Sequence, residues 1–196
     1  MFSLRLWRMA RHNAIVAALS IPITLVFTSC SCSGLSCQPA TLDDGSGKTT
    51  ATPQVIERLP VFSVKDTSGR EISSATLKDK VVLVDFWATW CPPCRKEIPH
   101  FNQLYARYRD EGLMIVGLAL DETEADVTRF NQQLPIEYPV ALASKEVQQQ
   151  FGGIEVYPTA FLIDRHGRVI KTYLGFTYPD EFERDIGAAI TNADPE

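Results

Sequence analysis

The chain has 196 residues, of which 45% are hydrophobic and 22% charged. This is ordinary globular usage and excludes a disordered tail, a collagen-like repeat and a multi-span membrane protein. Its 19 Lys and Arg against 24 Asp and Glu give a formal net charge of −5. The chain therefore lacks the basic surplus typical of nucleic-acid-binding proteins, and no nucleic-acid partner is expected.

The first residues have the composition of an export signal. Three arginines precede an uncharged, mostly apolar run over 14–27. As a helix this run would reach about 21 Å, short of the roughly 30 Å hydrocarbon core of a bilayer. A positive start, a short apolar centre and small residues after it are typical of a secretory signal. Without these arginines, 16 basic side chains remain against 24 acidic ones, a net charge of −8.

The apolar run ends in Thr28-Ser29-Cys30, which resembles a bacterial lipoprotein cleavage box. We therefore expect 1–29 to be an export segment and Cys30 to be lipidated, tethering the chain to a membrane. Ordinary cleavage and an uncleaved N-terminal anchor are the alternatives. All three place the rest of the chain outside the cytoplasm.

Residues 30–53 are predicted to form a flexible tether. They hold Cys30, Cys32 and Cys37 among serines, and then mostly Gly, Ser, Thr, Asp and Pro. A structural zinc site needs four ligands, and this patch has three cysteines and no histidine. A Cys32–Cys37 disulfide or unpaired linker thiols are the remaining interpretations. Composition of this kind is typical of a linker rather than a domain.

A folded domain is predicted over 54–192, beginning with its strands. Short apolar or β-branched runs bounded by turn residues predict these strands. The runs at 81–86 and 113–120 are almost wholly apolar, as in central strands covered on both faces. The other expected strands are 61–64, 70–72, 140–142, 160–163 and 169–173.

Helical periodicity appears between these runs. Apolar residues at helical spacing predict a helix from the CPPC sequence to Gly112, and a shorter one marked by Val127, Phe130 and Leu134. A helical turn is expected to end at Phe151, and a closing helix is expected from the spacing of apolar residues after 180. Alternating strands and helices predict an α/β sandwich of about 140 residues.

The chemistry is concentrated between residues 85 and 99. Cys91 precedes Pro92 and Pro93, which suits an N-cap followed by the first turn of a helix. The Cys91 sulfur would then face the positive end of the helix dipole, which favours the thiolate that attacks disulfides. Cys94 lies three residues on, within reach to close the ring. We expect Cys91 to be the exposed nucleophile and Cys94 the buried resolving thiol.

Two other interpretations of the cysteine pair are weaker. A structural disulfide across two residues would restrain little chain entropy. A zinc half-site lacks a second ligand pair, because no cysteine follows Cys94 and both His100 and His166 are isolated in the sequence. Dithiol redox chemistry is therefore favoured, with no metal and no cofactor besides the Cys91–Cys94 pair.

The segment resembles a known family. Asp85-Phe86-Trp87-Ala88 followed by Trp90-Cys91-x-x-Cys94 is similar to the thioredoxin active-site segment. The stretch from Trp90 to Glu97 resembles the extracytoplasmic TlpA/ResA-type thiol–disulfide oxidoreductases, which residues 55–192 fit in length and order of elements. The resemblance implies a thioredoxin-like α/β fold: a central mixed β-sheet flanked by helices, with an N-terminal β-hairpin extension.

The resemblance also implies two candidate bases for Cys94. Glu97 matches an acidic residue on the family's first helix, and it lies on the same helical face as Cys94. A solvated carboxylate is the alternative for Glu97. Asp85 matches the buried strand aspartate of thioredoxin, where many TlpA-type members have an apolar or amide residue. Either carboxyl would take the proton that Cys94 must lose.

A substrate surface is implied around the cysteine pair. Tyr157-Pro158-Thr159 matches the segment whose proline is cis in thioredoxin folds and faces the active cysteines. An ordinary trans proline is the alternative. Packing is expected to dominate for Trp87. The residues implied to contact substrate are Trp90, Pro92, Pro93, Tyr157, Pro158 and Thr159.

The family resemblance implies a reductase of disulfides in exported proteins, such as apocytochrome c or a copper-binding oxidase subunit. A membrane thiol protein would re-reduce it. The alternatives are a disulfide-forming oxidant, a peroxiredoxin-like peroxidase and a copper-binding protein. The peroxidase lacks its usual Pro-x-x-x-Thr-x-x-Cys context here, and copper binding lacks a histidine or methionine near either cysteine cluster.

Overall fold

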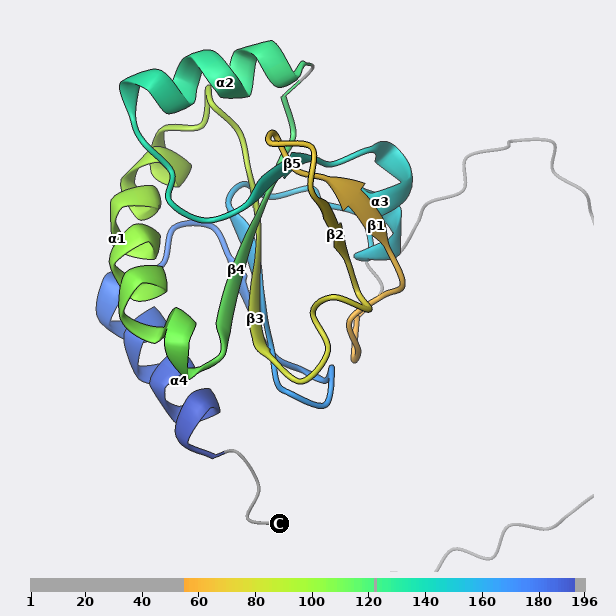
Figure 1. Ribbon diagram of the computed structural model, residues 1–196, viewed down its shortest axis with the longest axis vertical. Helices are drawn as coiled ribbons and strands as arrows, with labels where there is room; N and C mark the ends of the chain where they lie inside the picture. The colour runs from red at the N-terminus through yellow and green to blue at the C-terminus, as the bar shows by residue number, and fades with distance from the viewer. Residues whose placement is uncertain (1–54, 122, 193–196) are drawn as a thin grey trace, which may run out of the picture. The chain divides into compact units, whose positions relative to one another are not determined.

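The computed structural model describes residues 55–121 and 123–192, which form a layered α/β domain (Figure 1). A five-stranded sheet has the order β5-β4-β3-β6-β7. Its central strand β3 (Val81–Trp87) pairs in parallel with β4 (Leu113–Ala119) and antiparallel with β6 (Thr159–Ile163). The outer strands are β5 (Val140–Leu142) and β7 (Val169–Leu174), so the sheet is mixed.

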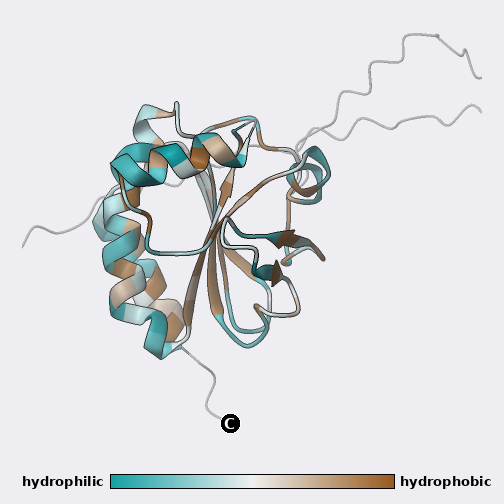
Figure 2. Ribbon diagram, turned by 45° about the horizontal axis from the view of Figure 1, so that its top comes forward, coloured by the Kyte–Doolittle hydropathy of each residue, from teal (hydrophilic) through white to brown (hydrophobic). Residues whose placement is uncertain are grey.

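Helices and a hairpin cover the two faces of the sheet. Helices α1 (Pro92–Tyr108) and α4 (Pro179–Thr191) lie side by side on one face, and α2 (Glu124–Gln133) packs there as well. The hairpin of β1 (Ser63–Lys65) and β2 (Glu71–Ser73) covers the other face with α3 (Lys145–Gln150). Figure 2 shows the same division by hydropathy, with apolar residues along the strands and polar ones on the outer helix surfaces.

Every residue of β3 is buried, because the strand has a core on each side. Alternate side chains point to opposite faces of a strand. Val81, Leu83 and Trp87 belong to the core beneath α1 and α4, whereas Val82, Val84 and Phe86 belong to the core beneath the hairpin and α3. Asp85 lies on the same face of β3 as Val81, Leu83 and Trp87, the face that α1 covers. Its carboxyl therefore lies among apolar side chains.

The sequence-based elements are confirmed with small shifts at their ends. The first strand begins at Ser63 rather than Val61, and β5 has the predicted bounds. Helix α1 ends at Tyr108, and a short 3-10 turn continues to Glu111 before Gly112, whose φ of +98° ends the helical path. This conformation favours glycine because it has no Cβ.

The predicted fold class is confirmed: the domain has the thioredoxin-like arrangement with an N-terminal hairpin. The predicted export segment (1–29), the predicted tether (30–53) and the cysteines Cys30, Cys32 and Cys37 lie outside the described residues. Among the residues that the structure does describe, no helix has the length and apolarity needed to cross a bilayer.

Candidate redox site

A disulfide joins Cys91 and Cys94 at the start of α1, with an S–S distance of 2.02 Å and Cα atoms 5.4 Å apart. Cys91 is the N-cap of the helix, with an extended backbone, and Pro92 and Pro93 begin the first turn. The backbone N–H of Cys94 donates to the Cys91 Sγ at 3.4 Å. The predicted placement of Cys91 at the positive end of the helix is confirmed.

The prediction that Cys91 is exposed is wrong for this disulfide-bonded form. Cys91 is only 3% exposed, and Cys94 is 1% exposed. The reason is that the Cys91 sulfur is bonded to the buried Cys94 sulfur and also accepts the backbone N–H of Cys94. Beside the buried cysteines, Trp90 is exposed, at 62%, and so is Pro92.

The turn that precedes the disulfide is fixed by a contact that the sequence analysis missed. The Thr89 N–H donates to the carboxylate of Asp121 at 3.0 Å, and the Thr89 hydroxyl donates to the same carboxylate. Asp121 follows β4, the strand beside β3. This contact ties the strand-to-helix turn to the neighbouring strand and so holds Cys91 in place.

Glu97 is buried under the first turns of α1, with 4% exposure. Its Oε1 accepts the backbone N–H of Thr177 at 2.8 Å. Burial raises the pKa of Glu97 from its ordinary value of 4.5 to about 7, although the Thr177 N–H acts in the opposite direction. The alternative of a solvated carboxylate is therefore contradicted by the burial of this side chain.

Asp85 approaches the same layer from β3 and is 2% exposed. Burial raises the pKa of the Asp85 carboxyl well above its ordinary range, and the charge of Glu97 raises it further. The structure thus brings together the two carboxyls that the sequence suggested. They interact electrostatically, so they titrate as a coupled pair.

The loop before β6 lies against the disulfide motif. The Tyr157–Pro158 bond is cis, as the resemblance implied. The Tyr157 ring meets the Trp90 ring edge to face, with centroids 5.8 Å apart. The Thr159 hydroxyl donates to the Val156 carbonyl at 2.7 Å. Of the two motif prolines, Pro92 is exposed and Pro93 is half-buried.

A short loop between β7 and α4 connects these two parts of the site. The Gly175 N–H donates to the Pro158 carbonyl at 2.8 Å, and Gly175 has a φ of +75°. Two residues on, Thr177 donates to Glu97, and its hydroxyl donates to the Gly175 carbonyl at 3.4 Å. The loop therefore contacts both the Pro158 segment and the buried carboxyl. No sequence signal marked Thr177, because its backbone and not its side chain holds Glu97.

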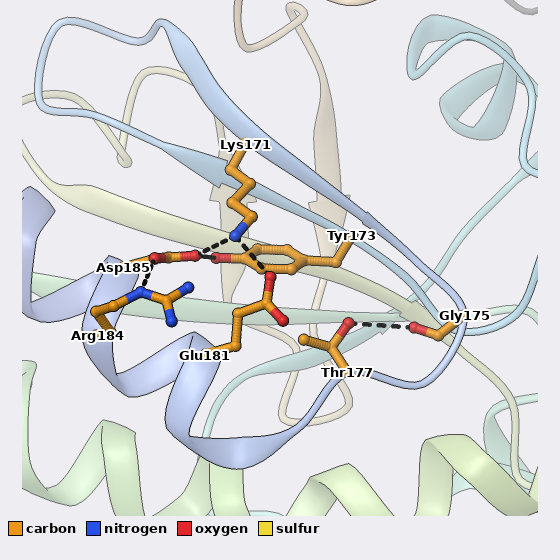
Figure 3. A network of polar contacts seen from close by, with 7 residues as sticks. All are labelled: Lys171, Tyr173, Gly175, Thr177, Glu181, Arg184 and Asp185. Atoms are coloured by element: carbon orange, nitrogen blue, oxygen red, sulfur yellow. Dashed lines mark hydrogen bonds and ion pairs between the residues drawn. The ribbon is translucent and has the colours of Figure 1, made fainter. Parts of the chain in front are cut away.

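Figure 3 shows how α4 is fastened to β7 beside that loop. Lys171 from β7 pairs with Glu181 at 2.7 Å and with Asp185, both on α4. The Tyr173 hydroxyl donates to Asp185 at 3.0 Å. This network anchors the first turns of α4 to the sheet edge, and so it fixes the end of the loop that carries Thr177.

A cysteine pair that closes at a helix N-terminus, beside buried carboxyls, is equipped for exchange with other thiols and disulfides. The fold and the site together define a thiol–disulfide oxidoreductase. In the described part of the chain, no group of three or more His, Cys, Asp or Glu side chains is arranged to hold a metal ion.

Comparison with known proteins gives the same class. Residues 55–172 match the model of the AhpC/TSA family. The thiol-disulfide oxidoreductase ResA of Bacillus thuringiensis (strain Al Hakam) is 37% identical over 130 residues, which cover 66% of this chain and 75% of the relative. ResA of Bacillus subtilis (strain 168) is 34% identical over 116 residues, covering 59% and 65% of the two chains.

Solved structures agree with these sequence matches. The thiol:disulfide interchange protein of Chlorobium tepidum TLS, a thioredoxin family protein, superimposes with a TM-score of 0.64 and 35% identity. The match covers 71% of this chain and 99% of that one. StoA of Bacillus subtilis gives a TM-score of 0.56 at 28% identity, covering 68% and 97%. The chain belongs to the AhpC/TSA family and is a relative of the ResA-type thiol–disulfide oxidoreductases, as its CPPC segment implied.

Proposed function

We propose that this protein reduces disulfides of exported proteins through Cys91 and Cys94, outside the cytoplasm. The observation that carries the proposal is the asymmetry of the pair: the Cys91 sulfur caps a helix N-terminus, whereas Cys94 is buried on α1, three residues before the buried Glu97. The helix end favours a thiolate on Cys91. The carboxyls supply a place for the Cys94 proton.

The exchange takes place in two displacement steps. The Cys91 thiolate attacks one sulfur of the substrate disulfide, and the other substrate sulfur leaves and takes up a proton. Cys94 then loses its proton and attacks the Cys91 Sγ. The Cys91–Cys94 disulfide forms, the mixed disulfide breaks, and the second substrate sulfur leaves as a thiol. Two electrons and two protons pass from the dithiol to the substrate.

Glu97 is the better placed of the two bases at neutral pH. A general base works best when its pKa lies near the operating pH. The pKa of Glu97 is raised to about 7, whereas burial and the charge of Glu97 hold the pKa of Asp85 well above its ordinary range. We therefore assign the larger role in Cys94 deprotonation to Glu97, with Asp85 as its coupled partner.

The surface around the disulfide fits an extended protein substrate. Trp90 is 62% exposed and borders Tyr157, and the nearby loop exposes Phe176 at 44% and Tyr178 at 70%. Exposed apolar groups gathered beside a reactive centre mark an interaction site. We assign substrate contact to these aromatic rings, to Pro92 and Pro93, and to the segment 157–159, in which Tyr157 is half-buried and Pro158 and Thr159 are buried.

The buried acids support the reducing direction of electron flow. Negative charge beneath the pair opposes the accumulation of thiolate, and this favours the disulfide form of the protein over its dithiol form. A protein whose disulfide is favoured is a reductant for its partners. Acting as an oxidant is the second candidate, because the helix N-terminus pulls in the other direction by stabilising the Cys91 thiolate.

The substrate, the donor and the location complete the proposal. Disulfides of an apocytochrome c or of a copper-binding oxidase subunit are the proposed targets, and a membrane thiol protein is the proposed donor. Residues 1–29 support export, with 30–53 as a tether and Cys30 as the lipidated membrane anchor. Mass spectrometry of the mature N-terminus tests the anchor: an unmodified Met1 or a plain cleaved end would exclude the lipid.

The reduction potential of the Cys91/Cys94 pair tests the direction. The full-length protein equilibrated with redox buffers of known potential should give a value near that of thioredoxin, roughly −270 mV. A value near about −120 mV would instead make the protein an oxidant. The Glu97→Gln variant sharpens the test, because removing one buried acid should move the potential toward less negative values.

A further inference from the structure

We call residues 175–178, which join β7 to α4, the aromatic loop. Phe176 is 44% exposed and Tyr178 is 70% exposed, whereas Thr177 between them is buried, at 9%. The rings of Phe176 and Tyr178 meet edge to face, with centroids 5.6 Å apart. The loop therefore presents two adjoining rings to solvent, on either side of a buried residue.

Helix α1 contacts the aromatic loop and the start of α4 at two points. The Thr177 N–H donates to Glu97 Oε1 at 2.8 Å, and His100 Nε2 donates to the Pro179 carbonyl at 2.9 Å. Glu97 and His100 are three residues apart, so they lie on the same face of the helix. Within the described part of the chain, Thr177 is the sole hydrogen-bond partner of the Glu97 side chain, since Oε2 has none.

The two ends of the aromatic loop are held by contacts that do not involve Glu97. At its start, the Gly175 N–H donates to the Pro158 carbonyl at 2.8 Å. At its end, the ion pairs of Lys171 fasten α4 to β7 (Figure 3). Among the described residues, the contact between Thr177 and Glu97 is then the only hydrogen bond from the middle of the loop to the redox site.

The strength of this hydrogen bond depends on the protonation state of Glu97. An N–H donates more strongly to a carboxylate than to a neutral carboxyl, and burial of both partners limits the competition from water. Burial raises the pKa of Glu97 to about 7, and the Thr177 N–H acts against it by favouring the carboxylate. Linkage is reciprocal, so whatever keeps the Thr177 N–H on Glu97 also favours the carboxylate form.

The titratable groups around Glu97 and His100 come from four parts of the fold. They are Cys94 on α1, Asp85 on β3, Tyr138 before β5, and Asp180 and Glu183 on α4. In the part of the chain that the structure describes, none of these side chains makes a hydrogen bond to the aromatic loop. A change made on the loop therefore reaches Glu97 through the Thr177 N–H.

We propose that Glu97 and Thr177 couple substrate docking on the aromatic loop to the deprotonation of Cys94. An apolar side chain beside the reacting cysteine of the substrate rests on Phe176 and Tyr178. Because the two rings flank Thr177, this contact holds the Thr177 N–H on Glu97 and favours the carboxylate. Glu97 is then ready to take the Cys94 proton once the mixed disulfide has formed. Thr177 is thus a positioning residue, and this inference rests on the proposed function.

Nuclear magnetic resonance of the Thr177 amide in the full-length protein measures the contact directly. In the disulfide form of the wild type, the shift of this amide proton should titrate with a midpoint near pH 7. Glu97→Gln keeps an acceptor but cannot ionise, so the titration should vanish while the amide stays protected from hydrogen exchange. Glu97→Leu removes the acceptor, and exchange at Thr177 should accelerate about tenfold.

Mixed disulfides on Cys91 of the Cys94→Ala variant test the docking step. One adduct carries 2-mercaptoethanol, and the other carries an uncharged synthetic heptapeptide whose single cysteine is flanked by leucine and phenylalanine. The peptide should lower the midpoint of the Thr177 titration by about one pH unit relative to 2-mercaptoethanol. Adding Phe176→Ala and Tyr178→Ala should bring the two midpoints together.

Ile170→Ala in the same background is the matched control. Ile170 is an apolar residue of β7 that is 48% exposed, and it lies outside the aromatic loop. Its replacement removes exposed apolar surface without removing either ring of the loop. The difference between the midpoints of the two adducts should therefore remain.

Two results would overturn the inference. One is a wild-type Thr177 amide proton whose shift does not change with pH. The other is an equal midpoint for the two adducts while Phe176 and Tyr178 are in place. The expected midpoints in a protein that reduces no exported protein would leave the coupling standing and count against the proposed function instead.

Discussion

The two sulfurs of the disulfide lie in different surroundings although they are bonded to each other. The Cys91 sulfur accepts the Cys94 N–H at the start of α1, and Cys91 follows the exposed Trp90. Cys94 is buried, as are Glu97, which is three residues further along α1, and Asp85 on β3. The first environment favours a thiolate at the surface, and the second makes ionisation depend on carboxyls that are themselves hard to ionise. The comparison shows how one short motif assigns its two steps to different sulfurs. Cys91 attacks the substrate disulfide, and Cys94 resolves the mixed disulfide.

Replacing each cysteine by alanine gives the largest expected effect. Cys94→Ala keeps the attacking sulfur and loses the resolving one, so it should accumulate a mixed disulfide through Cys91. Cys91→Ala should form none at this site, and both variants should lose turnover. Mass spectrometry of trapped adducts locates the bond. Preferential trapping on Cys94 in the Cys91→Ala variant would reverse the assigned roles of the two sulfurs.

The buried carboxyl of Glu97 should make the stability of the protein depend on pH. The pKa of Glu97 is raised from 4.5 to about 7 in the folded state, so its contribution is fully present below pH 4.5 and is lost as the pH rises through 7. Between pH 4.5 and pH 8 the wild type should lose about 3 kcal/mol of unfolding free energy that Glu97→Gln does not lose.

Urea unfolding of both proteins at several pH values measures this difference. Because Glu97 also raises the pKa of Asp85, the difference between the two slopes measures the contribution of Glu97 together with its effect on Asp85. If the unfolding free energies of the two proteins changed in parallel with pH, burial would not be holding the Glu97 carboxyl in its protonated form. The electrostatic difference between the surroundings of Cys91 and Cys94 would then be contradicted.

Substitution of the exposed Trp90, next to Cys91, should have a smaller effect than the changes at Glu97 and at the cysteines. Trp90→Ala removes an aromatic surface that is 62% exposed and one edge-to-face contact with Tyr157. Stability should change by less than about 1 kcal/mol. The rate of mixed-disulfide formation with a protein substrate should fall by roughly tenfold, as expected for the loss of about 1.4 kcal/mol of contact. An unchanged rate would remove Trp90 from the substrate surface.

The chain order of elements and the position of the cysteines were predictable because they depend on local signals. The apolar run of β3 and the prolines after Cys91 mark a buried strand that leads into a helix start, and the structure has both. The apolar spacing after 180 likewise predicted the closing helix, and the structure has α4 there with Phe182 and Ile186 buried. In each case residues near one another in sequence carried the whole pattern.

Contacts between distant segments were not predictable in this way. Thr177 reaches Glu97 through a backbone N–H, which carries no side-chain signature, across 80 positions of sequence. Asp121 has no local sequence feature that links it to Thr89, and only the pairing of β3 with β4 brings the two residues together. The exposure of Cys91 was mispredicted for a related reason, since it depends on which way the sulfur points once the ring is closed.

The central claim is that the buried carboxyls, led by Glu97, deprotonate Cys94. Stopped-flow measurement of mixed-disulfide resolution against pH, for wild type, Glu97→Gln and Asp85→Asn, tests it most directly. The wild-type rate should rise through about pH 7, where Glu97 ionises. Glu97→Gln should lower the rate about 100-fold and Asp85→Asn by roughly tenfold, in the range of general-base effects. An unchanged rate in Glu97→Gln, or a larger loss in Asp85→Asn, would contradict the account.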